Sequence, residues 1–347
     1  MESAYARAGV DIHAGERAVE MMKAHVASTS RPEVIGGLGG FAGFFDASGF
    51  TDYRHPVLAT STDGVGTKVA IAQAMDIHDT IGFDLVGMLV DDLVVVGAEP
   101  LFVTDYISCD HVVPEKIAAI VKGISAACVE AGAALLGGET AEHPGLVGEG
   151  EYDLAGATTG VVELDEILGS TRVRVGDRVV ALKSSGLHSN GYSLVRHVFS
   201  GMSLDAYVDE FGRTLGEELL TPTRVYARQC LQVIRSTTVH AMSHITGGGL
   251  ANNLARVMPA AMSAVIDRST WTPDPIFTMV QQIGRISTDD IEETLNMGVG
   301  MVMVCPEASV KRAIELLSSQ GIDSWDAGVV GEREPGGPAV TLHGKHK

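Results

Sequence analysis

Residues 79–108, DTIGFDLVGMLVDDLVVVGAEPLFVTDYIS, begin with a long apolar run that carries regularly spaced acids. The length of this run and its acid spacing predict a helix over 79–97, and the apolar segment after it predicts a strand over 100–108. A helix that is apolar almost all round is expected to be buried. The pair therefore predicts an α/β domain built around this helix and this strand.

The predicted helix carries three aspartates on one side, Asp84, Asp91 and Asp92. At about 100° per residue, Asp84 and Asp91 lie within about 20° of each other and Asp92 lies about 80° from Asp84. A bare buried carboxylate is costly, so these acids are expected to be paired or bound to metal. Two interpretations stay open: a solvated or capping stripe, and a Mg²⁺ site that Asp63 and Glu139 would complete.

Further helices and strands are predicted on both sides of this unit. They are an amphipathic helix over 15–27, a strand over 56–62 that ends at Asp63, a helix from Pro114 to Gly132, a strand and turn over 133–140, and a strand over 152–164. The polar stretch at 168–178 marks a domain boundary. Alternating strand-like and helix-like segments after it predict a second α/β domain.

The composition limits the class of protein and of partner. A chain of 347 residues is long enough for two domains. The net charge of -19, from 44 acids and 25 bases, argues against a nucleic-acid backbone as the main partner. A small phosphorylated ligand remains compatible, because metal ions and backbone N–H groups bind phosphate without a basic surface.

The cysteines and the apolar segments favour a cytoplasmic protein. The four cysteines do not form a C-x-x-C pair, so a zinc site is not expected, and their scarcity fits a reducing compartment. The N-terminal segment has no apolar run of the signal-peptide kind, and no stretch of about 18 apolar residues predicts a membrane span.

Several glycine turns have the composition of phosphate-binding loops. They are STDGVGTK (61–68), SSGLHSNGYSL (184–194), HITGGGLANNL (244–254), NMGVGM (296–301) and the glycine-rich segment 36–43, which is expected to be mobile or to wrap closely around a ligand. The first does not follow the P-loop order. Each turn alone is more often a tight connection. Together, and beside an acid cluster, they indicate a ligand with several phosphates or two phosphorylated ligands.

The histidines near these turns allow two interpretations. His188 lies inside the 184–194 turn, where it is either a surface or hydrogen-bonding residue or a group that binds an anion or carries a proton. His244, which precedes the glycine triplet, is a weaker candidate for the same anion-binding or proton-carrying role. His143 is interpreted as structural.

These motifs resemble one family closely, the phosphoribosylformylglycinamidine cyclo-ligases, also called aminoimidazole ribonucleotide synthetases. The resemblance rests on RPEVIGGLGGFAG, STDGVGTKVAIA, HDTIGFDLVGMLVDDLVVVGAEPLF, LLGGETAEHPG, SSGLHSNGYSLVR, HITGGGLANNLARVMP and TLNMGVGM, in the family's order and from about residue 7 to residue 330. It implies ATP-dependent ring closure of formylglycinamidine ribonucleotide in purine biosynthesis, with Mg²⁺. It also implies a fold of two α/β domains, residues 1–170 for ATP, Mg²⁺ and dimerisation and residues 171–347 for substrate-binding turns, with the N-terminal domains paired in a homodimer.

The resemblance also implies roles for individual residues. The expected metal ligands are Asp63 and Asp92, with Glu139 as a third ligand or a partner behind them. The expected catalytic residues are His188, Lys68 and Asp92. The expected ATP and phosphate contacts are Gly39 and Gly40 in a cover loop, Asp63, Gly64, Gly66, Thr67 and Lys68 at the first turn, Asn190 beside His188 at the substrate, and Gly247 and Gly248 at the ribose phosphate or another anion.

The chain departs from the family pattern at three positions, and other activities of the wider superfamily remain alternatives. Asp91 stands where asparagine is usual, His143 where methionine is usual and Leu295 where phenylalanine is common. The nearest enzymatic rival is thiamine-monophosphate kinase. A selenophosphate synthetase is expected to carry a reactive cysteine near its N-terminus, and the large amidotransferase is much longer. A nucleotide-binding protein without catalysis is the alternative from a different class.

Overall fold

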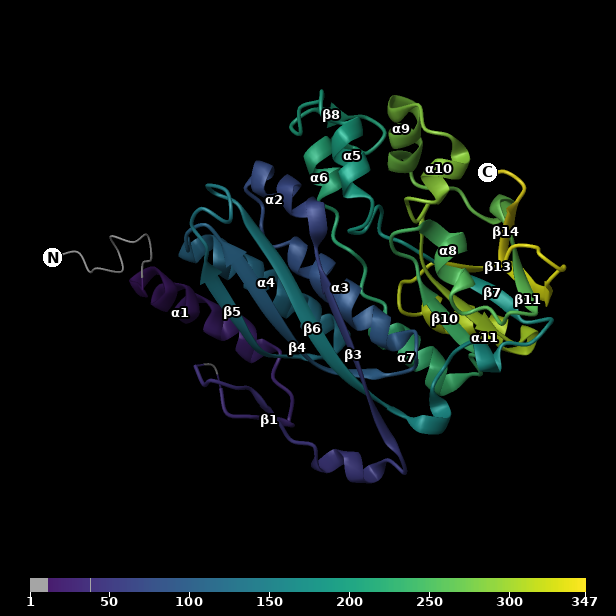
Figure 1. Ribbon diagram of the computed structural model, residues 1–347, viewed down its shortest axis with the longest axis horizontal. Coiled ribbons are helices and arrows are strands. Elements are labelled where there is room, and N and C mark those ends of the chain that lie inside the picture. The colour runs from purple at the N-terminus through teal and green to yellow at the C-terminus, as the bar shows by residue number, and fades with distance from the viewer. Residues whose placement is uncertain (1–11, 38) are drawn as a thin grey trace. The chain divides into compact units, whose positions relative to one another are not determined.

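The computed structural model describes residues 12–37 and 39–347 (Figure 1). The chain divides into two compact units, the first made of Met1–Leu93 and Glu99–Leu164, the second of Val94–Ala98 and Asp165–Lys347. Each unit has its own main sheet, with strand order β3-β6-β4-β5 in the first and β10-β12-β7-β13-β11-β14 in the second. The prediction of two α/β domains is therefore confirmed.

The sheet of the first unit contains the predicted strands. Its strands are β3 (Pro56–Gly64), β6 (Tyr152–Glu163), β4 (Glu99–Cys109) and β5 (Ala134–Glu142). β6 pairs antiparallel with β3 and β4, whereas β4 and β5 are parallel and are joined through helix α4 (Pro114–Ala131). A parallel pair needs such a crossover connection. The turn predicted in GGET is wrong, because Gly137–Thr140 continue β5 as strand.

Helices cover one face of this sheet. The apolar helix α3 (Ile81–Val94) packs its Leu85 and Leu89 side chains against Gly156 of β6. Helix α1 (Ile12–Ser28) packs against α4. The predicted helix over 79–97 is confirmed as a buried helix, two residues later at its start and three earlier at its end. α4 begins at Pro114, and Gly132 after it has the left-handed φ of 81° typical of a helix end, as predicted.

Short elements complete the first unit. They are β1 (Val34–Ile35) paired with β2 (Phe44–Phe45), the 3₁₀ helices η2 (Ser48–Asp52) and η3 (Gly66–Lys68), and α2 (Val69–Met75). The glycine-rich segment 36–43 therefore connects the two strands of a small hairpin.

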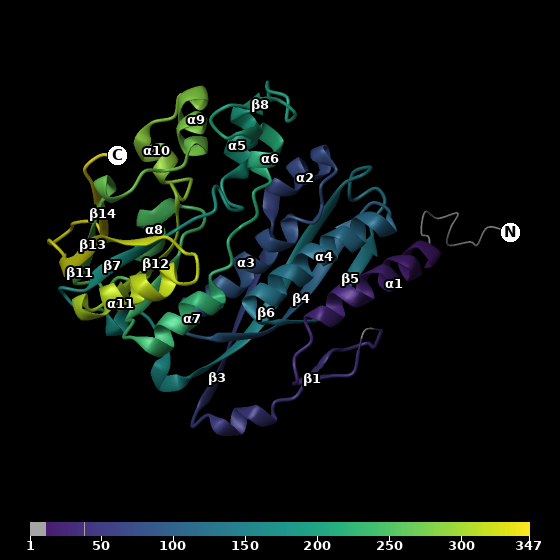
Figure 2. The same ribbon diagram turned by 180° about the vertical axis from the view of Figure 1, so that it is seen from behind.

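The second unit is built on an almost entirely antiparallel sheet. Its strands are β7 (Arg178–Lys183), β10 (Ala241–His244), β11 (Met262–Asp267), β12 (Val299–Cys305), β13 (Ser324–Glu332) and β14 (Val340–His343), and only β11 and β14 pair in parallel. Helix α8 (Gly249–Ala255) covers one face with an apolar cluster that includes Leu250 and Leu254, and α11 (Glu307–Ser318) packs on β7 and β13 (Figure 2).

The remaining elements of this unit are short. The helices are α5 (Tyr192–Val198), α6 (Leu215–Leu219), α7 (Ala227–Ser236), α9 (Pro275–Gly284) and α10 (Thr288–Glu292), the 3₁₀ helices η5 (Ser170–Arg172) and η6 (Arg268–Thr270), and a small hairpin of β8 (Tyr207–Val208) and β9 (Arg213–Thr214). The 3₁₀ helix η4 (Leu164–Glu166) lies at the change from one unit to the other.

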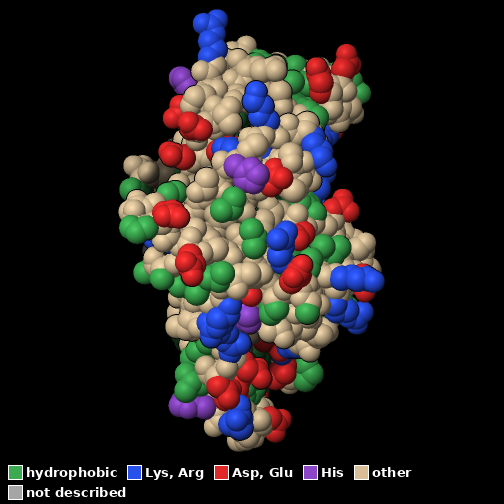
Figure 3. Space-filling model, turned by 90° about the vertical axis from the view of Figure 1, so that its right-hand side faces the viewer, with side chains coloured by type: hydrophobic (Ala, Val, Ile, Leu, Met, Phe, Trp, Pro, Cys, Tyr) green, Lys and Arg blue, Asp and Glu red, His purple; other side chains and the backbone are tan. Residues whose placement is uncertain are grey.

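Charged side chains of both signs lie at the surface (Figure 3), and the cysteines lie in the interior. On the face drawn in Figure 3, basic and acidic side chains are interspersed. All four cysteines are free and buried. In the part of the chain that the structure describes, no helix is long and apolar enough to cross a membrane.

Candidate functional site

Three of the predicted glycine turns meet at one edge of the second sheet. β12 lies between β10 and β7 and is antiparallel to both. The carboxyl ends of β7 and β10 and the amino end of β12 therefore lie together. We call the turns at this edge, residues 184–191, 245–249 and 296–298, the turn cluster. The first two lead from a strand into α5 and α8, as the sequence predicts.

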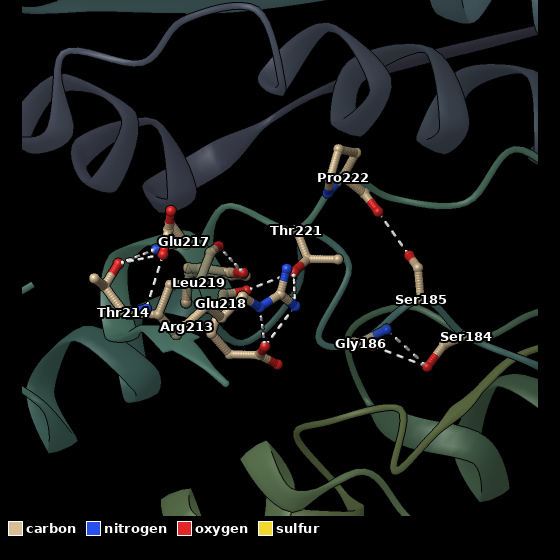
Figure 4. Close-up of polar contacts among 11 residues, drawn as sticks. Ser184, Ser185, Gly186, Arg213, Thr214, Glu217, Glu218, Leu219, Thr221 and Pro222 are labelled. Carbon is tan, nitrogen blue, oxygen red and sulfur yellow. Dashed lines mark hydrogen bonds and ion pairs between the residues drawn. The ribbon is translucent and has the colours of Figure 1, made fainter. Parts of the chain in front are cut away.

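Asn296 joins two turns of the cluster. Its Nδ2 donates to the Gly186 carbonyl at 2.9 Å, and its Oδ1 accepts from the Gly298 N–H at 2.8 Å and from Ser184 Oγ at 3.3 Å. Ser184 Oγ also donates to the Gly186 carbonyl, and Ser185 Oγ donates to the Pro222 carbonyl at 2.6 Å (Figure 4). The 184–191 turn is thus held in one conformation by buried hydrogen bonds.

His188 lies beneath the surface of this turn. Its side chain is only 1% exposed, and its φ of 61° is left-handed. Its Nε2 lies 3.1 Å from the Ser185 backbone N–H, which can only donate, so Nε2 is the acceptor and carries no proton. A Cβ on Gly300 would lie 2.5 Å from the His188 ring and 2.2 Å from the Tyr226 hydroxyl, so only glycine fits behind them. This geometry favours an anchor over an acid–base group.

Asn190, Gly247 and Gly248 lie at the accessible side of the cluster. Asn190 Oδ1 is 3.6 Å from the position that a Cβ on Gly247 would take, so these predicted residues are brought together. Asn253 donates to the carbonyls of Thr246, Gly247 and Gly249. For the N–H groups of Gly247 and Gly248, the described residues supply no hydrogen-bond partner. The turn can therefore offer two backbone donors to an anion.

The STDGVGTK segment of the first unit separates into an exposed and a buried part. Asp63 is exposed at the end of β3 and accepts from the Gly64 N–H at 2.8 Å. Gly66 has a φ of 71°, and Thr67 is exposed. Lys68 is fully buried, and its Nζ donates to the buried Asp84 Oδ1 at 2.7 Å. Burial lowers the pKa of Lys68, and Asp84 opposes this shift.

The acids of α3 divide in the same way. Asp84 and Asp91 are completely buried, whereas Asp92 is exposed. The prediction that a buried acid is paired is confirmed for Asp84. The solvated stripe is wrong for Asp84 and Asp91. The Lys68 ammonium is paired with Asp84 inside the unit, and its contact with a phosphate stays a prediction.

The three predicted metal ligands are not assembled in one chain. Asp63 is on β3 and Glu139 is on β5, the two edge strands of the sheet. Three interstrand spacings separate them, about 14 Å in all. Among residues 12–37 and 39–347, no group of three His, Cys, Asp or Glu side chains could hold a metal ion. Asp63 and Asp92 are each an accessible carboxylate that could share a cation with nucleotide phosphates.

A cavity in the first unit contains a carboxyl group that the sequence analysis missed. The cavity of about 370 Å³ is lined by residues of α1, α4 and β5 and by Gly39, Gly40 and Asp105. Asp105 has the same parity in β4 as the buried Val103 and Ile107, so it points toward the helices. Burial raises the pKa of Asp105 to about 7. Asp105 could have been recognised from the sequence as an acid at an inward-facing position of an otherwise apolar strand.

The residues predicted to bind the nucleotide therefore form two separate groups in the first unit. Gly39, Gly40 and Glu139 line the cavity together with Asp105. The second group lies at and just after the end of β3 and consists of Asp63, Gly64, Gly66 and Thr67. Asp105 has room for its carboxylate because β5 carries glycine opposite it: a Cβ on Gly138 would lie 2.2 Å from Asp105 Oδ1.

The fold and the glycine turns define a protein of the AIR synthase related class. The family model for the N-terminal domain of AIR synthase related proteins matches residues 48–162, and the model for the C-terminal domain matches residues 174–340. The chain is 51% identical to a phosphoribosylformylglycinamidine cyclo-ligase of Brevibacillus brevis, covering 96% of this chain and 98% of the relative. It is 48% identical to one of Syntrophotalea carbinolica, covering 97% of each. The chain belongs to the phosphoribosylformylglycinamidine cyclo-ligase family.

Solved structures of more distant proteins share the fold. Thiamine-monophosphate kinase of Stenotrophomonas maltophilia matches with a TM-score of 0.69 at 19% identity, over 95% of this chain and 97% of that one. The hydrogenase maturation protein HypE in complex with ATP matches with a TM-score of 0.65 at 18% identity, over 94% of this chain and 90% of that one. At such identities the likeness concerns the fold alone.

Proposed function

We propose that the protein closes the imidazole ring of 5-aminoimidazole ribonucleotide from formylglycinamidine ribonucleotide. ATP transfers its γ-phosphoryl group to the formyl oxygen and leaves as ADP. The amidine-derived nitrogen attacks the formyl carbon, loses its proton, and phosphate departs with the former formyl oxygen. The observation that supports this most is the identity of about half to named cyclo-ligases over nearly the full length of both chains.

Activation of the formyl oxygen depends on stabilising charge on the phosphates. Mg²⁺, when bound with ATP, would neutralise part of that charge. Asp63 and Asp92 are the accessible carboxylates suited to hold it, and Gly64, Gly66 and Thr67 let the backbone approach the nucleotide. Glu139 lies at the cavity with Gly39 and Gly40, so we assign it to the nucleotide rather than to the same ion. Asp91, which stands where the family usually has asparagine, is completely buried, whereas Asp92 beside it is exposed.

The turn cluster is proposed to hold the ribose phosphate of the substrate. The amides of Gly247 and Gly248 and the Asn190 side chain supply neutral donors, which suit an anion on a protein with a net charge of -19. His188 would act by fixing the Ser185 backbone within the turn. The N-terminal unit, with its uncovered sheet face, is proposed to pair in a cytoplasmic homodimer, and residues 1–170 and 171–347 to divide the roles between ATP and substrate.

One assay tests the function. Purified protein with Mg-ATP and formylglycinamidine ribonucleotide should form ADP and aminoimidazole ribonucleotide in equal amounts, and neither product without the other substrate. The same protein with thiamine monophosphate tests the kinase alternative, in which ADP would appear with a phosphorylated thiamine. ATP binding with no product from either substrate would instead support the catalytically silent alternative.

A further inference from the structure

We propose that residues 344–347 form a strap that supports the turn cluster, with His346 as its positioning residue. His346 acts through its neighbours on two turns of the cluster, residues 245–249 and 296–298. The inference rests on the proposed function, in which the turn cluster holds the ribose phosphate of the substrate. It assigns a role to a segment that lies beyond all the motifs of the family resemblance.

The strap follows β14 and is fixed at both of its ends. Gly344 turns the chain with a left-handed φ of 73° just after β14. Arg268 Nη1 donates to the Leu342 carbonyl at 2.6 Å, which fixes the end of that strand. The Lys347 N–H donates to the Trp271 carbonyl at 3.3 Å. The strap therefore has a defined position in the second unit, beside α10 (Figures 1 and 2).

His346 makes two side-chain contacts inside the unit. Burial raises the pKa of Glu292, but hydrogen bonds from Arg268 and His346 outweigh this effect and hold that pKa below its ordinary value. A carboxylate oxygen only accepts, so His346 Nε2, which lies 3.2 Å from Glu292 Oε1, is the donor. The His346 ring also meets the Trp271 ring edge-on, with centroids 4.8 Å apart. Its Nδ1 is buried without a partner among the described residues, so Glu292 supplies the only hydrogen bond to the ring there.

Glu292 supports the first of the two turns. It is the last residue of α10, and its backbone carbonyl presses against Gly249, where a Cβ would lie 1.7 Å from the carbonyl oxygen. Gly249 is the first residue of α8 and follows Gly247 and Gly248, whose N–H groups are the proposed anion donors. A shift of Glu292 would therefore move the start of α8 and the two donors before it.

Trp271 supports the second turn. Its Nε1 donates to the Met297 carbonyl at 2.9 Å, and both residues are buried. Met297 has a left-handed φ of 48°, a conformation that residues other than glycine seldom adopt and that persists only where the surroundings hold it. Asn296, the residue before it, binds the Gly186 carbonyl of the third turn. His346 thus contacts the side chains that support both turns.

The first test measures substrate affinity without turnover. Calorimetry in the absence of ATP would give the affinity of formylglycinamidine ribonucleotide for the parent, for His346→Ala and for the control His343→Ala, which changes an exposed histidine of β14. We expect His346→Ala to bind about tenfold more weakly and the control to bind within about twofold of the parent, because a displaced turn holds an anion less well. Equal affinity in folded His346→Ala would overturn the proposal.

A conservative variant separates a positioning role from a merely structural one. His346→Gln keeps an N–H donor for Glu292 and should restore the affinity to within about threefold of the parent. In both variants KM for ATP should stay within about twofold of the parent, because the nucleotide is proposed to bind in the first unit. An equal loss for ATP and for the ribonucleotide would indicate a general loss of structure and overturn the positioning role.

The tryptophans give a readout on the unmodified protein. Trp271 and Trp325 are the two tryptophans of the chain, and their ring centroids are 5.9 Å apart, so tryptophan emission reports on this cluster. Because Trp271 is bonded to the 296–298 turn, saturating formylglycinamidine ribonucleotide should change the emission of the parent. Unchanged emission with the ribonucleotide bound would overturn the link between strap and turns, whether or not any variant folds.

The outcomes are distinguishable from those of the proposed function. Ring closure with parental substrate affinity in His346→Ala would overturn the strap and leave the cyclo-ligase activity intact. Affinity that falls in His346→Ala, with no ring closure by the parent, would support the strap and remove the proposed reaction. No binding of the ribonucleotide by the parent would contradict both.

Discussion

At the residue scale, the Lys68–Asp84 pair decides between a structural and a catalytic role for Lys68. Both side chains are fully buried and 2.7 Å apart. Removing one partner of a buried pair costs about 3–5 kcal/mol because the other charge is left unpaired. We expect Lys68→Met to lower the free energy of unfolding by this amount in urea titrations, and the double change with Asp84→Leu to recover most of it.

A surface pair serves as the matched control for this experiment. Lys122 and Asp79 form an exposed ion pair, so Lys122→Met should change the free energy of unfolding by no more than about 1 kcal/mol. If Lys68→Met instead unfolds like the parent and loses only ATP affinity, then Lys68 contacts phosphate as the family resemblance implies.

Asp105 is expected to make stability depend on pH. Burial raises its pKa from 3.8 to about 7, so the folded state keeps a proton that the unfolded state has lost between these values. The stabilisation is present at low pH and is lost as pH rises through about 7. We expect the free energy of unfolding of Asp105→Asn to exceed that of the parent by on the order of 4 kcal/mol at pH 8 and to equal it near pH 4. Parallel pH profiles in chemical denaturation would contradict this.

A substitution at Asp92 is expected to change catalysis without changing the stability of the fold. Its side chain is exposed on α3, beside the buried Asp91. We expect Asp92→Ala to abolish ADP formation while the unfolding midpoint stays close to that of the parent, because substitutions of exposed side chains usually change stability little. Near-normal turnover at saturating Mg²⁺ would exclude a metal-binding role.

At the scale of elements, the turn cluster depends on what lies beneath it. His188 holds the Ser185 N–H, and Asn296 holds Gly186, so the turn geometry is set from below. We expect His188→Ala to raise KM for formylglycinamidine ribonucleotide at least tenfold and KM for ATP much less, since a loosened turn binds an anion less well. The exposed His197→Ala on α5 is the control. A selective loss of ATP affinity would reverse the assignment.

At the scale of the whole molecule, one face of the first unit's sheet is not covered by any helix of that unit among the described residues (Figure 1). Leu58, Thr60 and Thr62 of β3 and Tyr106 of β4 lie on this face, and Leu58 and Tyr106 are 58% and 43% exposed. Exposed apolar residues on a sheet face are typical of an interface. We expect light scattering to give twice the chain mass of 36.4 kDa, and Leu58→Glu to shift it toward the monomer. A monomeric parent protein would exclude the homodimer.

The element pattern was predictable because local physics sets it. The apolar run of α3, the proline and glycine at the ends of α4, and the strand-to-helix glycine turns were recognised from periodicity and backbone preference. The strand conformation of GGET was not predicted. Its Gly138 makes room for Asp105 on the neighbouring strand, and this requirement comes from a residue more than thirty positions earlier in the chain.

The sequence by itself determined the two α/β domains, the buried acidic helix and the family, since periodicity, glycine positions and motif order are local properties of the chain. Only the tertiary structure decided which acids are accessible and which side chains meet. It buried Lys68 against Asp84, placed Asp63 and Glu139 on opposite edge strands, turned His188 inward and set Asp105 in a cavity. Strand order and burial depend on contacts between distant segments, and residue types at a given spacing do not specify them.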